Sequence, residues 1–259
     1  MTVAPGSRPS VAAPRAALAE VFRSWQGEGL LLGRRMVFVR LAGCRVGCRY
    51  CDTAWAFETP ASVAVPGRPG ERLPNPVAIA DIVALVDAAD PPGAPGGPAP
   101  VSITGGEPCE QADVVEALLA ALAPREVMLE TAALHAPELA RLAPRCRWIA
   151  ADLKLPSATG LPDVLERHAR VLESGALQRS ETFFKLVVDG DVTPDELARA
   201  AAQLARWLPT APVFLQPVTP LGGSPPLPRE RLDALADVLA RAGLSVRVVP
   251  QVHKVLGVR

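Results

Sequence analysis

Residues 36–51 read MVFVRLAGCRVGCRYC, an apolar run followed closely by three cysteines. Met36–Leu41 is short and rich in β-branched residues, which is typical of a buried strand. Six similar runs follow along the chain, and helical patterns separate them, so the strands should be parallel. The sequence predicts an α/β fold, a partial, open (β/α) barrel of about six mainly parallel strands, with its active site at their carboxyl ends. The later runs are Val101–Ile103, Val127–Leu129, Trp148–Asp152, Phe183–Val188, Val213–Gln216 and Leu244–Val249.

Helix signals lie between these runs. Asn75 is expected to cap a helix that begins with a proline, and Ala112–Ala123 has helical periodicity without a sharp cap. Thr193 begins a capping box. Arg229–Ala242 should end at Gly243, because glycine adopts the left-handed backbone that closes a helix.

Length and composition favour one domain with a small-molecule partner. At 259 residues, 49% of them hydrophobic, the chain can bury one barrel core. Residues 1–17 are expected to form a disordered tail, 18–259 a single domain, and 89–100 a flexible Pro/Gly loop. The 27 basic residues balance the 27 acidic ones, which disfavours nucleic acid or a membrane as partner. Because the chain has no long apolar run and no signal-peptide core, we expect a cytoplasmic protein.

Cys44, Cys48 and Cys51 have the spacing C-x3-C-x2-C on the loop after the first strand. Such a loop can wrap three thiolates around a 4Fe-4S cluster and leave one iron open, which S-adenosylmethionine (SAM) could chelate. The alternatives are a zinc site, which usually takes four Cys or His ligands, and plain buried thiols. Cys109 and Cys146 lie outside this spacing and are expected to be buried and structural.

Six sequence blocks occur in a fixed order: EVFRSWQGEG with the first strand and cysteine behind it, CRYCDT, ITGGEP, ADLKLPSATG, FLQPVTP and QVHK. With them the chain, from about Glu20 to Lys254, resembles the radical SAM superfamily and, within it, the 7-carboxy-7-deazaguanine synthases. The resemblance implies a radical SAM core, a 4Fe-4S cluster, SAM and Mg²⁺. It also implies a homodimer and an electron donor such as flavodoxin or ferredoxin.

The reaction implied by the resemblance is that of a carbon–nitrogen lyase. It is the ring contraction of a pterin, 6-carboxy-5,6,7,8-tetrahydropterin, to 7-carboxy-7-deazaguanine with release of ammonia, in queuosine and 7-deazapurine biosynthesis. Protein groups would orient the reactants, because the radical chemistry belongs to cofactor and cluster.

The resemblance assigns the early blocks to the substrate. Gln26, Gly27 and Glu28 suit an aminopyrimidinone edge, the alternative being a plain turn at Gly27 and Gly29. Arg40 can bind the substrate carboxylate through two parallel hydrogen bonds, the alternative being a surface salt bridge. Thr53 is implied as the sole protein ligand of Mg²⁺, the alternative being a helix cap. The substrate set is Trp25, Gln26, Gly27, Glu28, Arg40 and Thr104.

Later blocks are assigned to SAM. The glycines of ITGGEP allow close approach of backbone to a ligand, but an ordinary βα turn has the same composition. Asp152 can accept from ribose hydroxyls and Lys154 can bind a carboxylate or ribose, the alternative being a solvated charge pair. The family often has Ser-Pro-Lys there, so this chain departs from it at two positions. The SAM set is Gly106, Glu107, Asp152, Leu153, Lys154, Gln216, Pro217, Val218 and Thr219.

Two other functions compete with this interpretation. A radical activase that abstracts hydrogen from a glycine of a partner protein would leave Gln26–Gly29 and Thr53 without roles. An iron–sulfur electron carrier or zinc module would need neither the Gly-Gly-Glu-Pro turn nor so large a barrel. Trp55, Trp148 and Trp207 are expected to pack in the core, and His253 is too isolated to be counted as catalytic.

Overall fold

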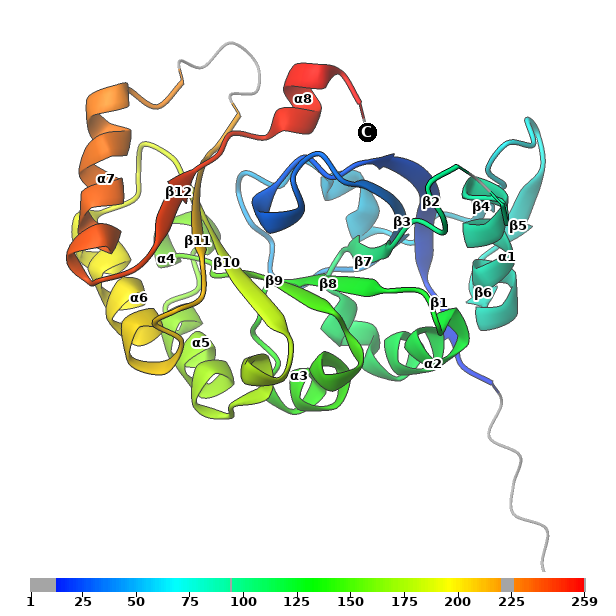
Figure 1. The fold of residues 1–259 in the computed structure, drawn as a ribbon, viewed down its shortest axis with the longest axis horizontal. Coiled ribbons are helices and arrows are strands. Elements are labelled where there is room, and N and C mark those ends of the chain that lie inside the picture. Colours follow the sequence, from blue (N-terminus) through cyan, green and yellow to red (C-terminus); the bar gives the residue numbers. More distant parts are fainter. Residues whose placement is uncertain (1–12, 94, 220–225, 259) are drawn as a thin grey trace, which may run out of the picture.

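The computed structural model describes residues 13–93, 95–219 and 226–258. At its centre is a curved sheet of eight strands in the spatial order β12-β11-β10-β9-β8-β7-β3-β2 (Figure 1). Neighbouring strands run parallel except β2 and β3, which are antiparallel. The predicted open barrel of mainly parallel strands is confirmed, although its sheet has eight strands where about six were expected. Its strands are β2 (Leu18–Trp25), β3 (Arg35–Leu41), β7 (Val101–Gly105), β8 (Val127–Thr131), β9 (Trp148–Asp152), β10 (Glu181–Val188), β11 (Val213–Pro217) and β12 (Val246–Val248).

Strand β2, at one edge of the sheet, was not among the predicted strands. Its register against β3 shifts between Leu18 and Glu20. Such a bulge interrupts the two-residue period that identifies a strand in sequence. Two adjacent pairs of its residues are buried, so buried and exposed side chains do not alternate. The pattern therefore carried no clear strand signal.

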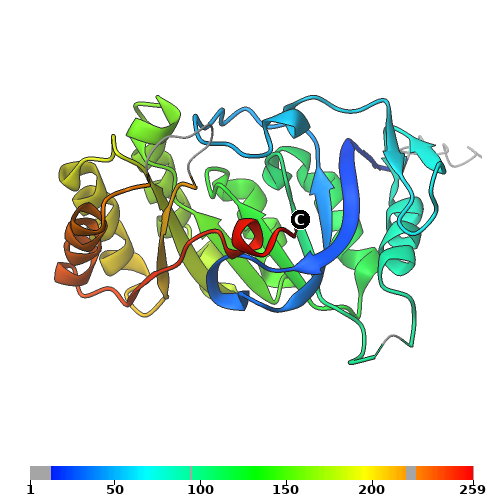
Figure 2. The same cartoon turned by 90° about the horizontal axis from the view of Figure 1, so that it is seen from above.

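Helices cover the convex face of the sheet, whereas α8 lies over its concave side (Figures 1 and 2). The predicted capping box is confirmed, because Thr193 Oγ1 accepts from the Glu196 backbone N–H at 3.2 Å. Gly243 follows α7 with the expected left-handed φ of 81°. The helices are α1 (Ile79–Ala89), α2 (Ala112–Leu122), α3 (Ala136–Leu142), α4 (Pro156–Thr159), α5 (Val164–Glu173), α6 (Pro194–Trp207), α7 (Arg229–Arg241) and α8 (Val252–Leu256).

Short elements complete the fold. Two small antiparallel sheets pair β1 with β6 and β4 with β5. The short strands are β1 (Arg15–Ala16), β4 (Ser62–Ala64), β5 (Arg72–Pro74) and β6 (Val77–Ala78), and the 3-10 helices are η1 (Gly29–Leu31), η2 (Ala54–Phe57), η3 (Pro108–Gln111), η4 (Ala143–Arg145) and η5 (Ala176–Arg179).

The prediction that Asn75 caps a helix was wrong. Helix α1 begins only at Ile79, because the residues before it form β6 and pair with β1. The Asn75 side chain instead accepts from the Leu18 backbone N–H at 3.0 Å and donates to the Leu18 and Pro60 carbonyls at 2.8 and 2.7 Å. Asn75 therefore ties the segment before α1 to β2.

Two predicted boundaries also need correction. The predicted tail extends too far, because Arg15 and Ala16 form β1 and Ala16 is fully buried. Residues 1–12 lie outside the described residues. The predicted loop begins one residue early, since Ala89 still belongs to α1. The described residues of 90–100 form no helix or strand, and the Ala99 N–H donates to Asp90 Oδ2 at 2.8 Å, which joins the two ends of the loop.

Side chains of the sheet alternate between two cores. Val37, Val39 and Leu41 of β3 belong to the larger apolar core, which includes residues of the outer helices. Met36 and Phe38 lie on the opposite face, inside the barrel, in a second cluster. This cluster fills one end of the barrel interior, and polar side chains follow it toward the carboxyl ends of the strands. The second cluster consists of Phe22, Met36, Phe38, Met128, Trp148, Ala150, Phe183 and Phe214.

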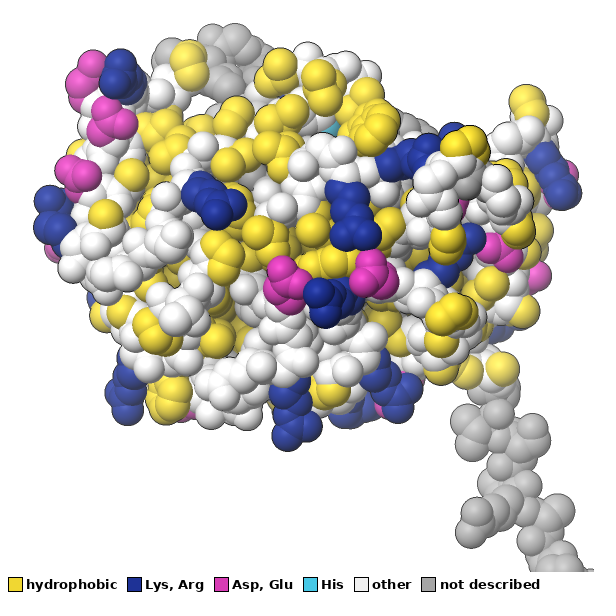
Figure 3. All heavy atoms as spheres, in the orientation of Figure 1, with side chains coloured by type: hydrophobic (Ala, Val, Ile, Leu, Met, Phe, Trp, Pro, Cys, Tyr) yellow, Lys and Arg dark blue, Asp and Glu magenta, His cyan; other side chains and the backbone are white. Residues whose placement is uncertain are grey.

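The face shown in Figure 3 carries dispersed charges of both signs, with apolar side chains along its upper edge. Trp148 is buried and Trp207 packs against the main core, as predicted. The prediction for Trp55 was wrong, because it is 56% exposed. Within the described part of the chain, no helix is long and apolar enough to cross a membrane.

Candidate active site

A cavity of about 510 Å³ opens at the carboxyl ends of the strands, a volume suited to a small-molecule site. All the predicted site residues line it except Leu153, Pro217 and Thr219. Leu153 and Pro217 each follow a lining residue, so alternation along the chain turns their side chains away. The predicted residues that do line it are Trp25, Gln26, Gly27, Glu28, Arg40, Cys44, Cys48, Cys51, Thr53, Thr104, Gly106, Glu107, Asp152, Lys154, Gln216 and Val218.

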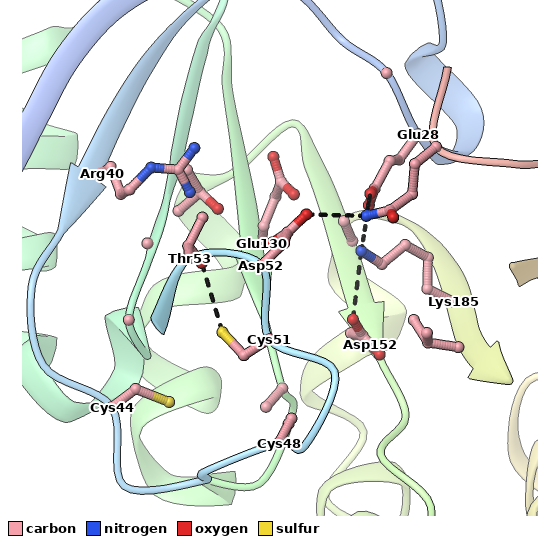
Figure 4. Close-up of a pocket in the computed structure, with 18 of the residues that line it drawn as sticks. Glu28, Arg40, Cys44, Cys48, Cys51, Asp52, Thr53, Glu130, Asp152 and Lys185 are labelled. Atoms are coloured by element: carbon pink, nitrogen blue, oxygen red, sulfur yellow. Dashed lines mark hydrogen bonds and ion pairs between the residues drawn. The ribbon is translucent and has the colours of Figure 1, made fainter. Parts of the chain in front are cut away.

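Cys44, Cys48 and Cys51 are half-buried, free thiols on the loop after β3. Figure 4 shows this loop curving around one side of the cavity. Burial raises the pKa of Cys44 and of Cys48, although Lys154 opposes the shift at Cys48. Arg49 fastens the loop, since its guanidinium contacts Asp191 at 2.8 Å and Asp189 at 3.2 Å.

The cysteine loop fits a cluster better than a single ion. Across residues 13–93, 95–219 and 226–258, no three Cys, His, Asp or Glu side chains converge on one point that could hold an ion. Separate thiols on one loop suit the distinct corners of a multi-iron cluster, whereas tetrahedral zinc needs four converging ligands. Bound iron would also offset the burial that now disfavours the thiolates.

The Gly105–Gly106 turn has a structural reason for its glycines. A Cβ on Gly106 would lie 1.6 Å from the Gly43 carbonyl oxygen, and Gly105 has a φ of +115°. The Gly106 N–H donates to the Leu41 carbonyl at 2.9 Å, which seats the turn against the start of the cysteine loop. The glycines thus allow backbone to approach backbone at a lining position of the cavity.

Glu107 is almost fully buried, and its carboxylate is turned toward β8. It accepts from Thr131 Oγ1 at 2.6 Å and from the backbone N–H groups of Ala132 and Cys109 at 2.7 and 3.0 Å. These bonds join the Gly-Gly turn to the end of β8. In this arrangement Glu107 orients the turn rather than presenting its carboxylate to the cavity.

The loop after β2 places two polar side chains in the cavity. Gln26 Nε2 donates to Glu130 Oε1 at 3.1 Å, and Glu130 also accepts from Ser102 Oγ at 2.6 Å. Glu28 Oε1 accepts from the side-chain amides of Gln216 and Gln251, both at 3.0 Å. Burial opposes ionisation of Glu28, but Lys185 and Gln251 prevail and lower its pKa to about 2.

A chain of buried charges continues from Glu28 across the sheet (Figure 4). Lys185 on β10 forms ion pairs with Glu28 and, at 3.3 Å, with Asp152 Oδ2 on β9. The same Asp152 oxygen pairs with Lys154 at 2.8 Å, and the Lys154 ammonium lies 5.3 Å from the Tyr50 ring centroid. These two lysines and two carboxylates are each less than 15% exposed, so burial makes their mutual pairing necessary.

Three polar atoms at the cavity have no hydrogen-bond partner within the described residues: Tyr50 Oη, Asp152 Oδ1 and Gln216 Oε1. Buried polar atoms are nearly always paired, so unpaired ones on a cavity wall point to a ligand that would pair with them. A carboxylate oxygen and an amide oxygen both accept, so a ligand with N–H or O–H donors matches this side of the cavity.

Arg40 and Thr53 lie across the cavity from Lys185 and Asp152 (Figure 4). Arg40 Nε donates to Glu20 Oε1 at 3.0 Å, and the two residues are register partners on β3 and β2. The pair is only 16% exposed, so it is not an ordinary surface salt bridge. Thr53 precedes η2, but its hydroxyl makes no capping bond and lies 3.6 Å from Cys51 Sγ.

The C-terminal segment closes one side of the cavity, which the sequence did not predict. The Val252 N–H donates to the Gly27 carbonyl at 3.0 Å. His253 packs so tightly on Gly27 that a Cβ there would lie 2.3 Å from His253 Nδ1. Lys254 pairs with Asp52 at 3.0 Å, beside the last cysteine of the loop. The QVHK block therefore joins the Gln26–Glu28 loop to the cysteine loop.

His168, which was not a predicted site residue, fixes the backbone of Lys154 by a hydrogen bond. Its Nε2 accepts from the Lys154 backbone N–H at 2.9 Å, which leaves Nδ1 to donate to the Ala133 carbonyl at 3.0 Å. Burial lowers the pKa of His168 to about 4, so the imidazole is neutral at physiological pH. Ala133 has an unusual φ of +51° at the end of β8, so His168 also ties down a strained turn.

Cys109 and Cys146 are buried, as predicted, while Glu130, Lys185 and Gln251 are cavity residues that sequence analysis missed. One signal could have identified Lys185. The chain has only three lysines, Lys154, Lys185 and Lys254, among its 27 basic residues. All three line the cavity.

The sequence is similar to known proteins over nearly its whole length. No family model matches the sequence. The 7-carboxy-7-deazaguanine synthase of Geobacter sulfurreducens is 36% identical over 252 residues, covering 94% of this chain and 98% of that protein. The synthase of the same name from Archaeoglobus fulgidus is 31% identical over 251 residues, covering 95% of this chain and 100% of that protein.

Solved structures share the fold. QueE from Escherichia coli matches with a TM-score of 0.54 at 22% identity, over 90% of this chain and 93% of that chain. A radical SAM methyltransferase from Sphaerobacter thermophilus matches with a TM-score of 0.58 at 21% identity, over 84% and 66%. Because near full-length relatives exceed 30% identity and the barrel fold is shared with these solved structures, the chain belongs to the 7-carboxy-7-deazaguanine synthase family.

Proposed function

We propose that this protein is a radical SAM lyase that converts 6-carboxy-5,6,7,8-tetrahydropterin to 7-carboxy-7-deazaguanine with loss of ammonia, in queuosine or 7-deazapurine biosynthesis. The observation that carries the proposal is one cavity that brings together the three-cysteine loop, the Gln26–Glu28 loop and the Asp152–Lys154 segment. Near full-length relatives that bear the synthase name support the choice of reaction.

The cysteine side of the cavity would hold the cofactors. Cys44, Cys48 and Cys51 would hold a 4Fe-4S cluster, and the cavity residues at the ends of β9 and β11 would bind SAM. Bound together, these groups supply the one-electron chemistry that removes a hydrogen atom from a substrate carbon. Asp152 Oδ1 and Gln216 Oε1, which are buried and unpaired, accept from the hydroxyl and amino groups of SAM. Lys154 keeps Asp152 ionised for this purpose.

The opposite side would bind the pterin. Gln26, Glu28 and Glu130 present amide and carboxylate groups to an aminopyrimidinone edge, which offers several N–H donors side by side. Arg40 binds the substrate carboxylate, with its guanidinium held by Glu20 and over the Phe22 ring at 5.6 Å. Thr53 would offer its hydroxyl oxygen to a Mg²⁺ ion, which would help to neutralise the substrate carboxylate. The residues thus bind and orient the substrate and exclude water.

Further parts of the proposal follow from family membership. The enzyme would receive electrons from a small one-electron carrier such as flavodoxin or ferredoxin, would act as a homodimer and would work in the cytoplasm. The Gln26–Glu28 loop and Thr53 favour the pterin reaction over a radical activase, because a peptide substrate has no aminopyrimidinone edge.

Anaerobic reconstitution with iron and sulfide tests the function directly. The parent should take up iron and, with a strong reductant, SAM, Mg²⁺ and the carboxypterin, form the deazaguanine and ammonia. The variant Cys44→Ala/Cys48→Ala/Cys51→Ala should bind no cluster and form no product. Cys146→Ala is the matched control, because this thiol is buried outside the cavity lining and donates to the Leu142 carbonyl at 3.4 Å. Cleavage of SAM by the triple variant would refute the proposal.

A further inference from the structure

His168 is a buried polar residue for which the proposed function has no use. Among the buried residues of α5, all of which the structure describes, His168 alone is polar, and its side chain is 1% exposed. It does not line the cavity, so it does not touch a ligand there. A core histidine with both nitrogens paired can be purely structural. Whether His168 is more than that depends on what its two hydrogen bonds hold in place.

One bond of His168 holds the chain just after β9 leaves the sheet. Strand β9 pairs with β10 up to the register partners Asp152 and Lys185. The Leu153 N–H makes the next bond, to the Lys185 carbonyl at 2.9 Å. The N–H that follows is that of Lys154, and its acceptor is His168 Nε2 at 2.9 Å. His168 therefore fixes the backbone two residues beyond Asp152, whose unpaired oxygen we assign to SAM.

The other bond of His168 holds the segment that follows β8. Strand β8 pairs with β9 up to Thr131. Beyond that residue, the Ala132 N–H donates to Glu107 Oε2 at 2.7 Å and the Ala133 carbonyl accepts from His168 Nδ1 at 3.0 Å. The φ of +51° at Ala133 is unfavourable for a residue with a Cβ, and such a conformation persists only where its neighbours hold it.

These hydrogen bonds connect three loops at the carboxyl ends of β7, β8 and β9, which are adjacent in the sheet (Figure 1). Glu107 joins the Gly-Gly turn after β7 to the segment after β8, and His168 joins that segment to Lys154 after β9. The first and third loops carry Gly106 and Asp152, which we assign to SAM. Two groups that bind one ligand must be held at a fixed separation, and the side chains behind them provide this.

We propose that His168 is a positioning residue for SAM, which holds the Asp152–Lys154 segment in place relative to the Gly-Gly turn so that both meet the same SAM molecule. The inference rests on the proposed function for SAM as the ligand of these loops. The imidazole must be neutral in this role, because Nε2 accepts a hydrogen bond only without a proton. Burial lowers the pKa of His168 to about 4, which satisfies this condition at physiological pH.

The test is the dissociation constant of SAM for reconstituted enzyme, without reductant so that no turnover occurs. His168→Phe keeps a ring but removes both bonds, and it should weaken SAM binding about tenfold while its iron content stays at the parent value. The amide oxygen of His168→Gln can reach the position of Nε2, so this variant should recover most of the affinity. The shorter side chain of His168→Asn reaches only the position of Nδ1 and should bind SAM as weakly as His168→Phe.

Leu172→Ala is the matched control, because Leu172 is 2% exposed on the same helix and its loss leaves a cavity in the core. It should lower the unfolding temperature at least as much as His168→Phe but leave SAM affinity at the parent value. Parent affinity in His168→Phe, or an equal loss of affinity in Leu172→Ala, would overturn the inference. If His168→Phe does not fold, equal SAM affinity in His168→Asn and His168→Gln would overturn it. A parent that binds SAM but forms no deazaguanine would refute only the proposed function, because the affinity measurement needs no turnover.

Discussion

The polar side chains on the two sides of the cavity differ in whether they already have hydrogen-bond partners within the protein. On the substrate side, defined as Gln26, Glu28, Arg40 and Glu130, each named side chain already has a hydrogen bond or ion pair within the protein. On the cofactor side, defined as Tyr50, Asp152 and Gln216, each residue has a buried polar atom without a partner in the described chain. One side is preorganised by its own bonds, and the other is completed by a ligand.

This difference has an energetic consequence. An unpaired buried polar atom costs about 1–3 kcal/mol, which a ligand recovers when it supplies the missing partner. On the substrate side a ligand exchanges one hydrogen bond for another, so it gains less energy but must match the geometry closely. The cofactor side should therefore determine affinity and the substrate side selectivity. Changes on the cofactor side should have the larger effects.

Asp152→Ala should have the largest effect, because it leaves Lys154 and Lys185 buried without their shared carboxylate. Removing one partner of a buried ion pair costs about 3–5 kcal/mol, and SAM binding should be lost with it. The measurements are the free energy of unfolding in denaturant and the SAM dissociation constant. The matched control is Asp189→Ala, whose partner Arg49 is half-exposed, with an expected loss of at most about 1 kcal/mol. Equal losses in both would contradict the comparison.

His168 makes the cofactor side sensitive to pH. Its folded pKa of about 4 lies below its ordinary 6.5, so the unfolded chain takes up a proton first as pH falls. The stabilisation is present above pH 6.5 and is lost as pH falls toward 4, by about 3 kcal/mol. As pH falls from 6.5 to 4, the free energy of unfolding should fall less in His168→Gln than in the parent. Between pH 7 and 8, the difference in unfolding free energy between the two proteins should stay constant. A parallel fall in both proteins would exclude His168 as the source.

Arg40→Lys tests the substrate side. The charge remains, but an ammonium cannot reproduce two parallel hydrogen bonds to a carboxylate. The transition-state stabilisation measured by kcat/KM for the carboxypterin should therefore fall by about 1.5–3 kcal/mol. SAM affinity measured without the pterin should not change. Arg35→Lys on the same strand is the control, since that guanidinium donates to the Pro95 carbonyl outside the cavity. An unchanged kcat/KM in Arg40→Lys would remove Arg40 from the site.

The sequence predicted features that depend on neighbouring residues. Apolar runs identified seven strands, the capping box at Thr193 was correct, and the cysteine spacing located the loop that borders the cavity. In each case the signal lies within a few residues. Asn75 shows the limit of this approach, because its side chain binds Leu18, 57 residues away, instead of capping a helix.

The missed site residues depend on distant partners. Lys185 and Gln251 meet Glu28 across 157 and 223 residues, so no local pattern reports either contact. The two-residue period of β10 places Lys185 on the inner face of the sheet with Phe183. The period does not show which inner residue packs in the apolar layer and which one reaches the cavity, because that depends on where each strand ends in the assembled sheet.

The smallest effect is expected at Thr53. Its hydroxyl does not cap η2, so the helix-cap explanation is not supported and the oxygen is available for Mg²⁺. Thr53→Ala should keep its cluster and its slow cleavage of SAM, but lose about tenfold in product formation at Mg²⁺ concentrations that saturate the parent, a change of about 1.4 kcal/mol. Thr53→Ser keeps the oxygen and should retain most activity, whereas a packing role for the methyl group would reverse that order. The measurement is turnover against Mg²⁺ concentration after exhaustive chelation. Identical curves of turnover against Mg²⁺ concentration for the parent and Thr53→Ala, or full parent activity without divalent metal, would show that Thr53 is not a ligand. Arg40 alone would then bind the substrate carboxylate.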